Sequence, residues 1–201
     1  LTGMAMAKGY KQLKKLLEEI AGLAAGPLKR KLNGWLADAK IRKLYKKLSS
    51  LSEVKTIWQV DKPVDLHEFY YPSKIAIDDK LIAIRNLSDL RTDRSIVIEG
   101  VVGQGKSIFL RFLCAQESMR FERVPVLFEL RRIQPNETLH DHILLTLKSF
   151  GFSSIDEESF RHLAESGRAV LFLDAFDEID ETLQVTILTE LERMLTTYPK
   201  L

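Results

Sequence analysis

The segment that most constrains this chain is residues 95–113, SIVIEGVVGQGKSIFLRFL, where an apolar run, a glycine-rich turn and a Lys-Ser pair precede a helical pattern. Residues 100–107 fit the pattern G-x-x-x-x-G-K-[ST]. Glycines let such a loop wrap closely around phosphate with its N–H groups pointing inward, and the start of a helix adds partial positive charge. The sequence therefore predicts a phosphate-binding loop between a short strand at 96–99 and a helix at 106–119.

Two side chains of this loop have expected chemical roles. Lys106 would reach the β and γ phosphates of a nucleotide as a compact cation, and the Ser107 hydroxyl would ligate Mg²⁺. The Lys106 ammonium would also assist catalysis by neutralising charge on the phosphates. The residues predicted to bind the nucleotide are Gly100, Gly103, Gln104, Gly105, Lys106, Ser107 and Ile108.

A phosphate loop needs a second, acidic element to hold the magnesium ion, and residues 170–179, VLFLDAFDEI, supply one. Asp174 ends the apolar run, so it would lie at the carboxyl edge of a parallel sheet, where ligands of α/β proteins bind. We expect Asp174 to hold Mg²⁺ directly or through water. Asp177 and Glu178 would orient or deprotonate the attacking water, the alternative being ordinary charges on a solvated turn.

From residue 95 onward, short apolar runs alternate with helical patterns. Strands are expected at 124–130 and 168–174, and helices at 106–119, 139–150, 156–167 and 181–198. Strands that alternate with helices form a largely parallel sheet covered on both faces. The fold class predicted is α/β, a three-layer sandwich with a parallel sheet.

The first 52 residues differ from the rest in charge. They hold 12 Lys or Arg against 3 acids, which leaves 18 basic and 25 acidic residues in the remainder. Apolar side chains such as Leu13, Leu16 and Ile20 recur at helical spacing. We therefore expect a basic amphipathic helical region at 1–52, a connector at 53–94 that packs on the next part, and a nucleotide-binding region at 95–201.

Three partners fit the basic helices. A lysine-rich amphipathic helix favours an anionic membrane surface, and clustered cations also attract nucleic acid phosphates. The interpretation we prefer is a helical adaptor that packs on the nucleotide-binding region or on neighbouring subunits.

Other residues carry weaker signals. His140 and His142 lie two apart, on different sides of a helix, which argues against a paired metal site. Arg131 and Arg132 end the second strand and would face either phosphate or a partner, although an exposed pair at a strand end is the more common outcome. The aromatic residues of 68–75 would either line an adenine pocket or pack the connector.

The single cysteine and the hydropathy pattern bear on the compartment. Cys114 lies in FLRFLCAQ, which suggests a buried helix face, and one cysteine cannot form an internal disulfide. No apolar run reaches the length of about 18 residues that a spanning helix requires. We expect a cytoplasmic protein in a reducing compartment.

The loop VVGQGKS together with VLFLDAFDEI resembles the NACHT family of signal-transduction NTPases, within the STAND group. The second motif of that family is an apolar strand followed by Asp, a small residue, an apolar residue and Asp-Glu. Residues 174–178 match it, with Ala175 where the family often has Gly. VPVLFELRRI resembles the second strand of the family, so the resemblance covers about 69–201.

The resemblance implies ATP or ADP with Mg²⁺, slow hydrolysis, and a nucleotide-controlled switch to self-association in innate immunity, in bacteria against phage. The family pattern would continue after residue 201 with a strand that lies between the two motif strands, and then with a region that senses an unknown trigger. We therefore expect an incomplete sheet and an N-terminal piece of a longer protein. The alternatives are a nucleic-acid-stimulated, motor-like ATPase, or a basic nucleic-acid-binding module with a vestigial nucleotide site.

Overall fold

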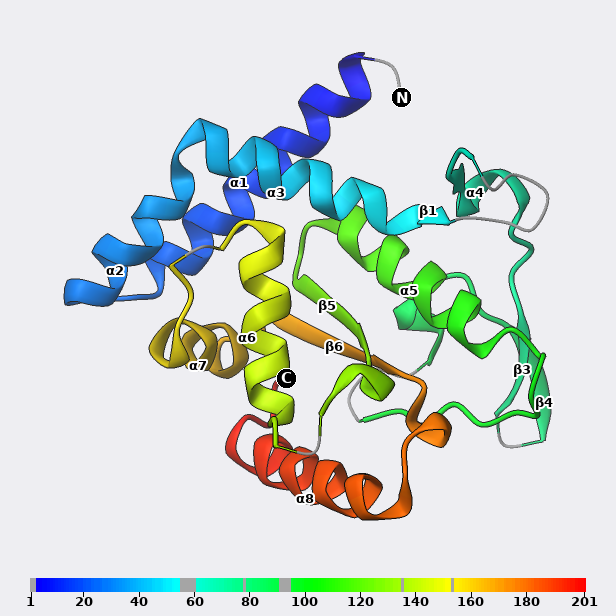
Figure 1. The fold of residues 1–201 in the computed structure, drawn as a ribbon. Helices are drawn as coiled ribbons and strands as arrows, with labels where there is room; N and C mark the ends of the chain where they lie inside the picture. The colour runs from blue at the N-terminus through cyan, green and yellow to red at the C-terminus, as the bar shows by residue number, and fades with distance from the viewer. Residues whose placement is uncertain (1–2, 55–60, 78, 91–94, 135, 153) are drawn as a thin grey trace.

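The chain begins with a group of three helices. The computed structural model describes residues 3–54, 61–77, 79–90, 95–134, 136–152 and 154–201. Helices α1 (Gly3–Gly22), α2 (Gly26–Asn33) and α3 (Asp38–Ser49) follow one another through short turns (Figure 1). Pro27 lies in the first turn of α2, where its missing N–H needs no helical partner. None of the helices in the described ranges has the length and apolarity needed to cross a bilayer.

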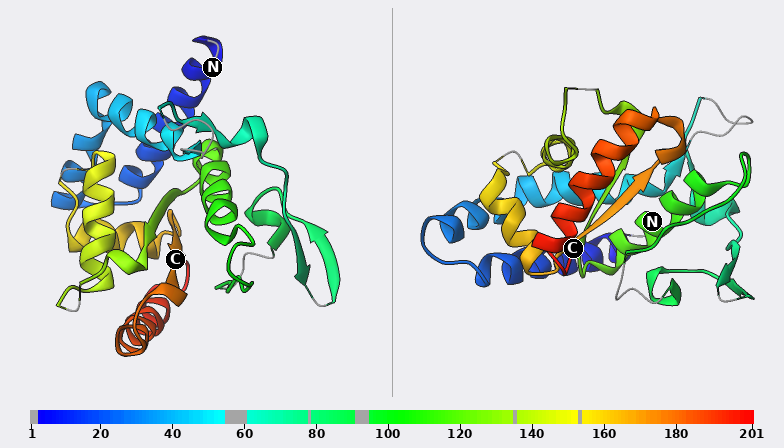
Figure 2. Two further views of the ribbon diagram at one scale, coloured as in Figure 1. Left: turned by 45° about the vertical axis from the view of Figure 1, so that its right-hand side comes forward. Right: turned by 90° about the horizontal axis from the view of Figure 1, so that it is seen from below.

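The connector contains two small antiparallel pairs. Strand β1 (Glu53–Val54) pairs with β2 (Val64–Asp65), and the short helix α4 (Leu66–Phe69) follows. Strand β3 (Lys74–Ile77) pairs with β4 (Lys80–Ala83) as a hairpin at the edge of the molecule (Figure 2). The connector's expected end at residue 94 lies outside the described residues.

The helices and strands expected after the phosphate loop are confirmed. They are α5 (Lys106–Arg120), β5 (Val124–Glu129), α6 (Leu139–Phe150), α7 (Glu157–Glu165), β6 (Ala169–Asp174) and α8 (Glu181–Thr197). Three of the helices begin at a side-chain cap that accepts a backbone N–H, supplied by Thr138, Asp156 and Asp180. Strands β5 and β6 run parallel, and their last residues, Glu129 and Asp174, lie opposite each other.

The prediction of a strand at 96–99 was wrong, since residues 95–100 have no regular secondary structure. A strand requires backbone hydrogen bonds to a neighbouring strand. Among the described residues the parallel ladder joins β5 to β6, and residues 96–99 take no part in it. Ile98 packs against the side chains around α5, whereas 83% of Val97 is exposed. An apolar run is therefore not sufficient for strand formation here.

The two faces of the β5–β6 pair are covered by different helices. Along β6, Ala169, Leu171 and Leu173 pack into one apolar cluster, and Val170 and Phe172 into another. The first cluster contains side chains of α1, α3, α6, α7 and α8, and the second is built around α5. This alternation places helices on both sides of the sheet, so the α/β arrangement is present with a small, two-stranded parallel sheet among the described residues.

The N-terminal helices share the first cluster with the α/β part of the chain. Trp35, 2% exposed, packs edge-on against Phe152 with 4.6 Å between ring centroids, and its indole Nε1 donates to Ser154 Oγ at 3.0 Å. Arg168 donates to Glu19 of α1 at 2.8 Å. These contacts join segments more than 100 residues apart, so the three helices and the sheet are packed around one core.

Candidate functional site

The loop of residues 100–107 is a tight turn that is closed by the side chain of Gln104. Gly103 (φ +86°) and Gly105 (φ +80°) adopt the left-handed backbone conformation, which strains any residue with a Cβ atom. Gln104 Oε1 accepts the backbone N–H of Val101 at 3.0 Å. Gly105 lies immediately before α5, so the loop leads directly into the N-terminus of a 15-residue helix.

Lys106 is held between the loop and the second acidic motif. Its Nζ donates to the carbonyl oxygen of Gly100 at 2.7 Å and lies 3.5 Å from Asp177 Oδ2. The ammonium group therefore lies over the loop, where a cation can meet phosphate oxygens. The contact with Asp177 brings a residue predicted to be catalytic to the loop.

Ser107 and Asp174 meet across the site. Ser107 Oγ donates to Asp174 Oδ1 at 3.1 Å, and the same carboxylate oxygen accepts the N–H of Ala175 at 2.9 Å. Asp174 is the last residue of β6, and Ala175 turns the chain sharply with φ +60°. The strand end and the helix start thus bring together two side-chain oxygen atoms from residues that are 67 apart in the chain.

This pair of oxygens fits a magnesium ion. Mg²⁺ in proteins is held by one or two carboxylates, and the rest of its shell comes from substrate phosphates and water. A hydroxyl in hydrogen-bond contact with one carboxylate matches that donor set. Nowhere in the described ranges, this site included, do three or more His, Cys, Asp and Glu side chains gather in a way that could hold a metal ion.

Glu178, the other predicted catalytic acid, forms an ion pair. Arg131 Nη1 donates to Glu178 Oε2 at 2.6 Å, and Arg131 Nη2 donates to Glu129 Oε2 at 2.9 Å. The hydrogen bond with Glu178, and then that with Glu129, raises the pKa of Arg131. Burial acts to raise the pKa of Glu129, but hydrogen bonds from Arg131 and Arg132 outweigh it and hold that pKa below its ordinary value. The sequence-based interpretation of Arg131 as an exposed strand-end residue missed this network.

A cavity of about 330 Å³ opens beside Ser107 and Asp174. This volume is near the lower end of the range for small-molecule sites. Ile108, which the sequence predicted to bind the nucleotide, forms part of the wall of this cavity. The lining residues are Glu53, Val54, Ser107, Ile108, Arg111, Glu129, Arg131 and Asp174.

Four of these lining residues were missed by sequence reasoning: Glu53, Val54, Arg111 and Glu129. Arg111 lies one helical turn after Ser107, so it faces the same side of α5, and that spacing is a usable signal. Glu129 ends β5 opposite Asp174, which places both carboxylates at one sheet edge. Glu53 comes from β1, far earlier in the chain, and no local pattern links it to the site.

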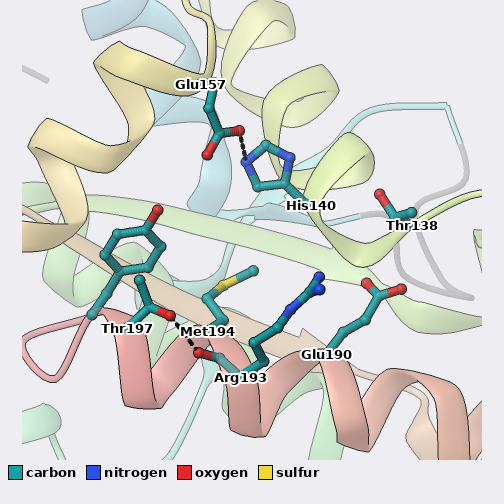
Figure 3. A pocket seen from close by; sticks show the side chains of 8 residues that line it. Thr138, His140, Glu157, Glu190, Arg193, Met194 and Thr197 are labelled. Carbon is teal, nitrogen blue, oxygen red and sulfur yellow. Dashed lines mark hydrogen bonds and ion pairs between the residues drawn. The ribbon is translucent and has the colours of Figure 1, made fainter.

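A second cavity, of about 350 Å³, lies between α6, α7 and α8 (Figure 3). It is lined by Thr138, His140, Glu157, Glu190, Arg193, Met194, Thr197 and Tyr198. None of these residues belongs to the phosphate loop or the acidic motif. We assign the functional site to the smaller cavity because Ser107 and Asp174 line it.

The weaker candidates lie away from the loop. His140 Nε2 lies 2.8 Å from Glu157, whereas His142 Nε2 lies 2.7 Å from Glu137, so the two imidazoles face different partners. Of the connector aromatics, Tyr70 stacks on Phe112 of α5 with 4.4 Å between ring centroids, as expected for packing of the connector.

Two other connector aromatics, and the cysteine, are also placed by the structure. Phe69 is 49% and Tyr71 is 81% exposed, and neither lines the cavity beside Ser107. Cys114 is buried, and burial raises the pKa of its thiol, which makes it unreactive.

Comparison with protein families gives a match that covers more than half of the chain. The family model described as the Sigma-54 interaction domain matches residues 75–197. The matched range is 123 of the 201 residues and contains the phosphate loop, Arg131, Asp174 and Glu178. No curated protein and no solved structure matches the chain. The helices α1 to α3 lie outside the matched range.

Proposed function

This chain belongs to the Sigma-54 interaction domain family of P-loop NTPases, and we propose that it binds Mg-ATP at residues 100–108 and hydrolyses it slowly. The observation that carries this proposal is the hydrogen bond of 3.1 Å between Ser107 and Asp174, at the wall of a cavity. It joins the phosphate loop to the carboxyl end of β6, as a nucleotide site with magnesium requires.

Each residue of the site has a role in this proposal. The N–H groups of the loop and Lys106 bind the phosphates, and Ser107 with Asp174 holds the magnesium ion. When bound, that ion neutralises charge on the transferred phosphoryl group. Glu178 accepts the proton of the attacking water, and Asp177 orients Lys106, from which it is 3.5 Å away.

We further propose that the nucleotide state acts as a switch that controls self-association. The Arg131–Glu178 ion pair supports low basal turnover, because a carboxylate that already accepts a hydrogen bond of 2.6 Å is a weaker base for water. The family match supports the P-loop superfamily without singling out the NACHT group. A role in innate or antiphage immunity therefore stays a prediction that rests on the resemblance of residues 174–178.

A second candidate follows from the matched family, whose description names interaction with sigma-54. In that case, ATP turnover would be coupled to a protein partner and would rise when the partner is present. The two candidates differ in kinetics: a switch retains its nucleotide, whereas an ATPase that does work on a partner turns over quickly when stimulated.

The test of the proposed function compares ATP binding with ATP hydrolysis in the purified 201-residue chain. Bound nucleotide is released with acid and identified by chromatography, and turnover is measured with excess Mg-ATP. We expect Glu178→Gln to bind ATP normally and to hydrolyse it at least about 10-fold more slowly, since general base catalysis contributes about 10²–10⁴-fold. Glu181→Gln, an exposed acid at the start of α8, is the matched control. Normal turnover of the Glu178 variant would remove that residue from catalysis.

A further inference from the structure

Helices α1 and α3 carry a dense set of exposed cations, which we call the basic face. It consists of Lys8, Lys11, Lys14, Lys15, Arg42, Lys43, Lys46 and Lys47. The acids on the same two helices are Glu18, Glu19 and Asp38. The basic face therefore has a clear excess of positive charge on an outer surface.

Little of this charge is neutralised within the chain. Among the residues that the structure describes, one cation of the basic face forms an ion pair, Lys15 with Glu19, at a long 3.8 Å. Asp38 instead accepts a hydrogen bond of 2.8 Å from the hydroxyl of Tyr10. An uncompensated cluster of this size attracts a polyanion over a distance set by the ionic strength.

The apolar faces of the same helices are already buried. Leu13 and Ile20 of α1 and Ile41 of α3 are 0% exposed, and they pack into the core shared with the α/β part. Among the described side chains, the large apolar ones exposed here are Met6, near the start of α1, and Leu23, directly after its end. A helix that lies in a membrane surface needs a continuous apolar face to insert. The apolar faces of α1 and α3 could insert into a membrane only if the two helices left the core.

The basic face is also a preformed surface. A Cβ atom on Gly9 would come within 2.8 Å of the Tyr45 ring, so the backbone of α1 approaches α3 closely. The Tyr10–Asp38 hydrogen bond joins the same two helices. Both helices lie at the opposite end of the molecule from α8 (Figures 1 and 2). The cations are therefore presented by a packed pair of helices.

We propose that the basic face of α1 and α3 binds nucleic acid through the phosphate backbone of a duplex, without base recognition. Seven of its eight cations are lysines, which act as point charges, and one is an arginine, the side chain that forms two parallel hydrogen bonds with phosphate or guanine. This composition favours contacts with phosphate over recognition of bases. The aromatic rings of the two helices, Tyr10 and Tyr45, are half-buried and pack against the core, so neither is fully exposed for stacking with a single-stranded base. This function is independent of nucleotide binding at residues 100–108.

The experiment measures binding of the full 201-residue chain to a fluorescent 20-base-pair duplex of arbitrary sequence, by anisotropy, between 50 and 200 mM salt. The test variant carries Lys11→Gln, Lys14→Gln, Lys46→Gln and Lys47→Gln. The control carries Lys62→Gln, Lys74→Gln, Lys80→Gln and Lys148→Gln, which removes the same charge from exposed positions elsewhere. Circular dichroism confirms that both variants remain folded, and vesicles of phosphatidylserine and phosphatidylcholine are tested in parallel.

We expect the unmodified chain and the control to bind the duplex, with an affinity that falls steeply with salt and is the same for a second sequence. The test variant should bind at least about 10-fold more weakly, with a log–log salt slope reduced by about 3 to 4, since each lost phosphate contact contributes about 0.9. Equal loss in the control, no binding at 50 mM salt, or binding to the vesicles in place of the duplex would overturn the proposal.

Discussion

The edge of the β5–β6 sheet and the surface of α1 and α3 use charge in opposite ways. At the sheet edge, Arg131 pairs with Glu178 and Lys106 lies against Asp177, so cations and acids from different elements restrain one another. On α1 and α3, lysines occupy the positions that remain after the apolar side chains enter the core. Charges at the sheet edge are therefore largely paired within the chain, whereas most of the charge of the basic face is not compensated by the described residues.

The largest expected effect tests whether these two regions are parts of one folded body. Trp35→Ala should lower the free energy of unfolding by about 3–5 kcal/mol, because it leaves a cavity where the indole packs against Phe152. Chemical denaturation monitored by circular dichroism should still show one transition, moved to lower denaturant. Trp35→Phe keeps a ring in place and should lose less. Two separate transitions in the unmodified chain would contradict a shared core.

The next effect concerns the metal side of the sheet edge. Asp174→Ala should weaken Mg-ATP binding by about 100-fold or more, since changing even the outer partners of metal ligands costs about 10–100-fold. Affinity for ATP without Mg²⁺ should change little. Calorimetry with and without Mg²⁺ distinguishes the two, and Glu181→Ala is the control. Unchanged affinity in the presence of Mg²⁺ would show that Asp174 is not a ligand.

A smaller effect is expected where the basic helices meet the α/β part. Lys31 donates to Asp156, which also caps α7, and this hydrogen bond is the main cause that lowers the pKa of Asp156 to about 2. Asp156→Ala should cost about 1 kcal/mol of stability, and Asp156→Asn, which keeps a capping oxygen, should cost less.

The pH dependence of this contact has a definite sign. A carboxyl group with a lowered pKa stabilises the fold above its unfolded pKa of about 3.9, and the contribution is lost as the pH falls through the folded value of about 2. The difference in melting temperature between the unmodified chain and Asp156→Ala should therefore shrink between about pH 4 and pH 2. A difference that is constant with pH would show that the charge of Asp156 contributes nothing.

The smallest effect sharpens the role of the ion pair at the sheet edge. Arg131→Ala should raise ATP turnover by about 2- to 5-fold, because it frees the Glu178 carboxylate from its ion pair. This change in rate corresponds to about 0.4–1 kcal/mol, the free energy that an exposed ion pair contributes. Arg132→Ala is the control, because in the described part of the chain Arg132 pairs with Glu129 and not with Glu178. A strong fall in turnover would instead place Arg131 on the phosphates.

The sequence predicted the parts of the site that depend on local pattern. The phosphate loop, helix α5 and the strand that ends in Asp174 follow from glycine spacing, capping and hydrophobic runs, and the structure brings Ser107 and Asp174 together. The boundaries of α6 were predicted at the residues where Thr138 caps the helix and Gly151 ends it. These features are decided by residues close together in the chain.

Features that depend on distant neighbours were not predictable. The Arg131–Glu178 pair joins residues 47 apart, and no periodicity indicates that the two side chains meet. The apolar run at 96–99 looked like a strand, but a strand is defined by its partner. Packing of the helices on the nucleotide-binding region was the preferred interpretation, but the contact of Trp35 with Phe152 could not be inferred, because a helical pattern does not show which distant residue an apolar side chain meets.

The central claim is that residues 100–108 bind the phosphates of ATP, and the most direct measurement is Mg-ATP binding by calorimetry to the unmodified chain and to Lys106→Ala. Lys74→Ala, at an exposed position in β3, is the control. The account predicts one binding site in the unmodified chain and in the control, and a loss of at least about 100-fold in affinity for Lys106→Ala, equal to about 2.7 kcal/mol. Equal affinity in all three proteins, or no binding by the unmodified chain, would contradict it.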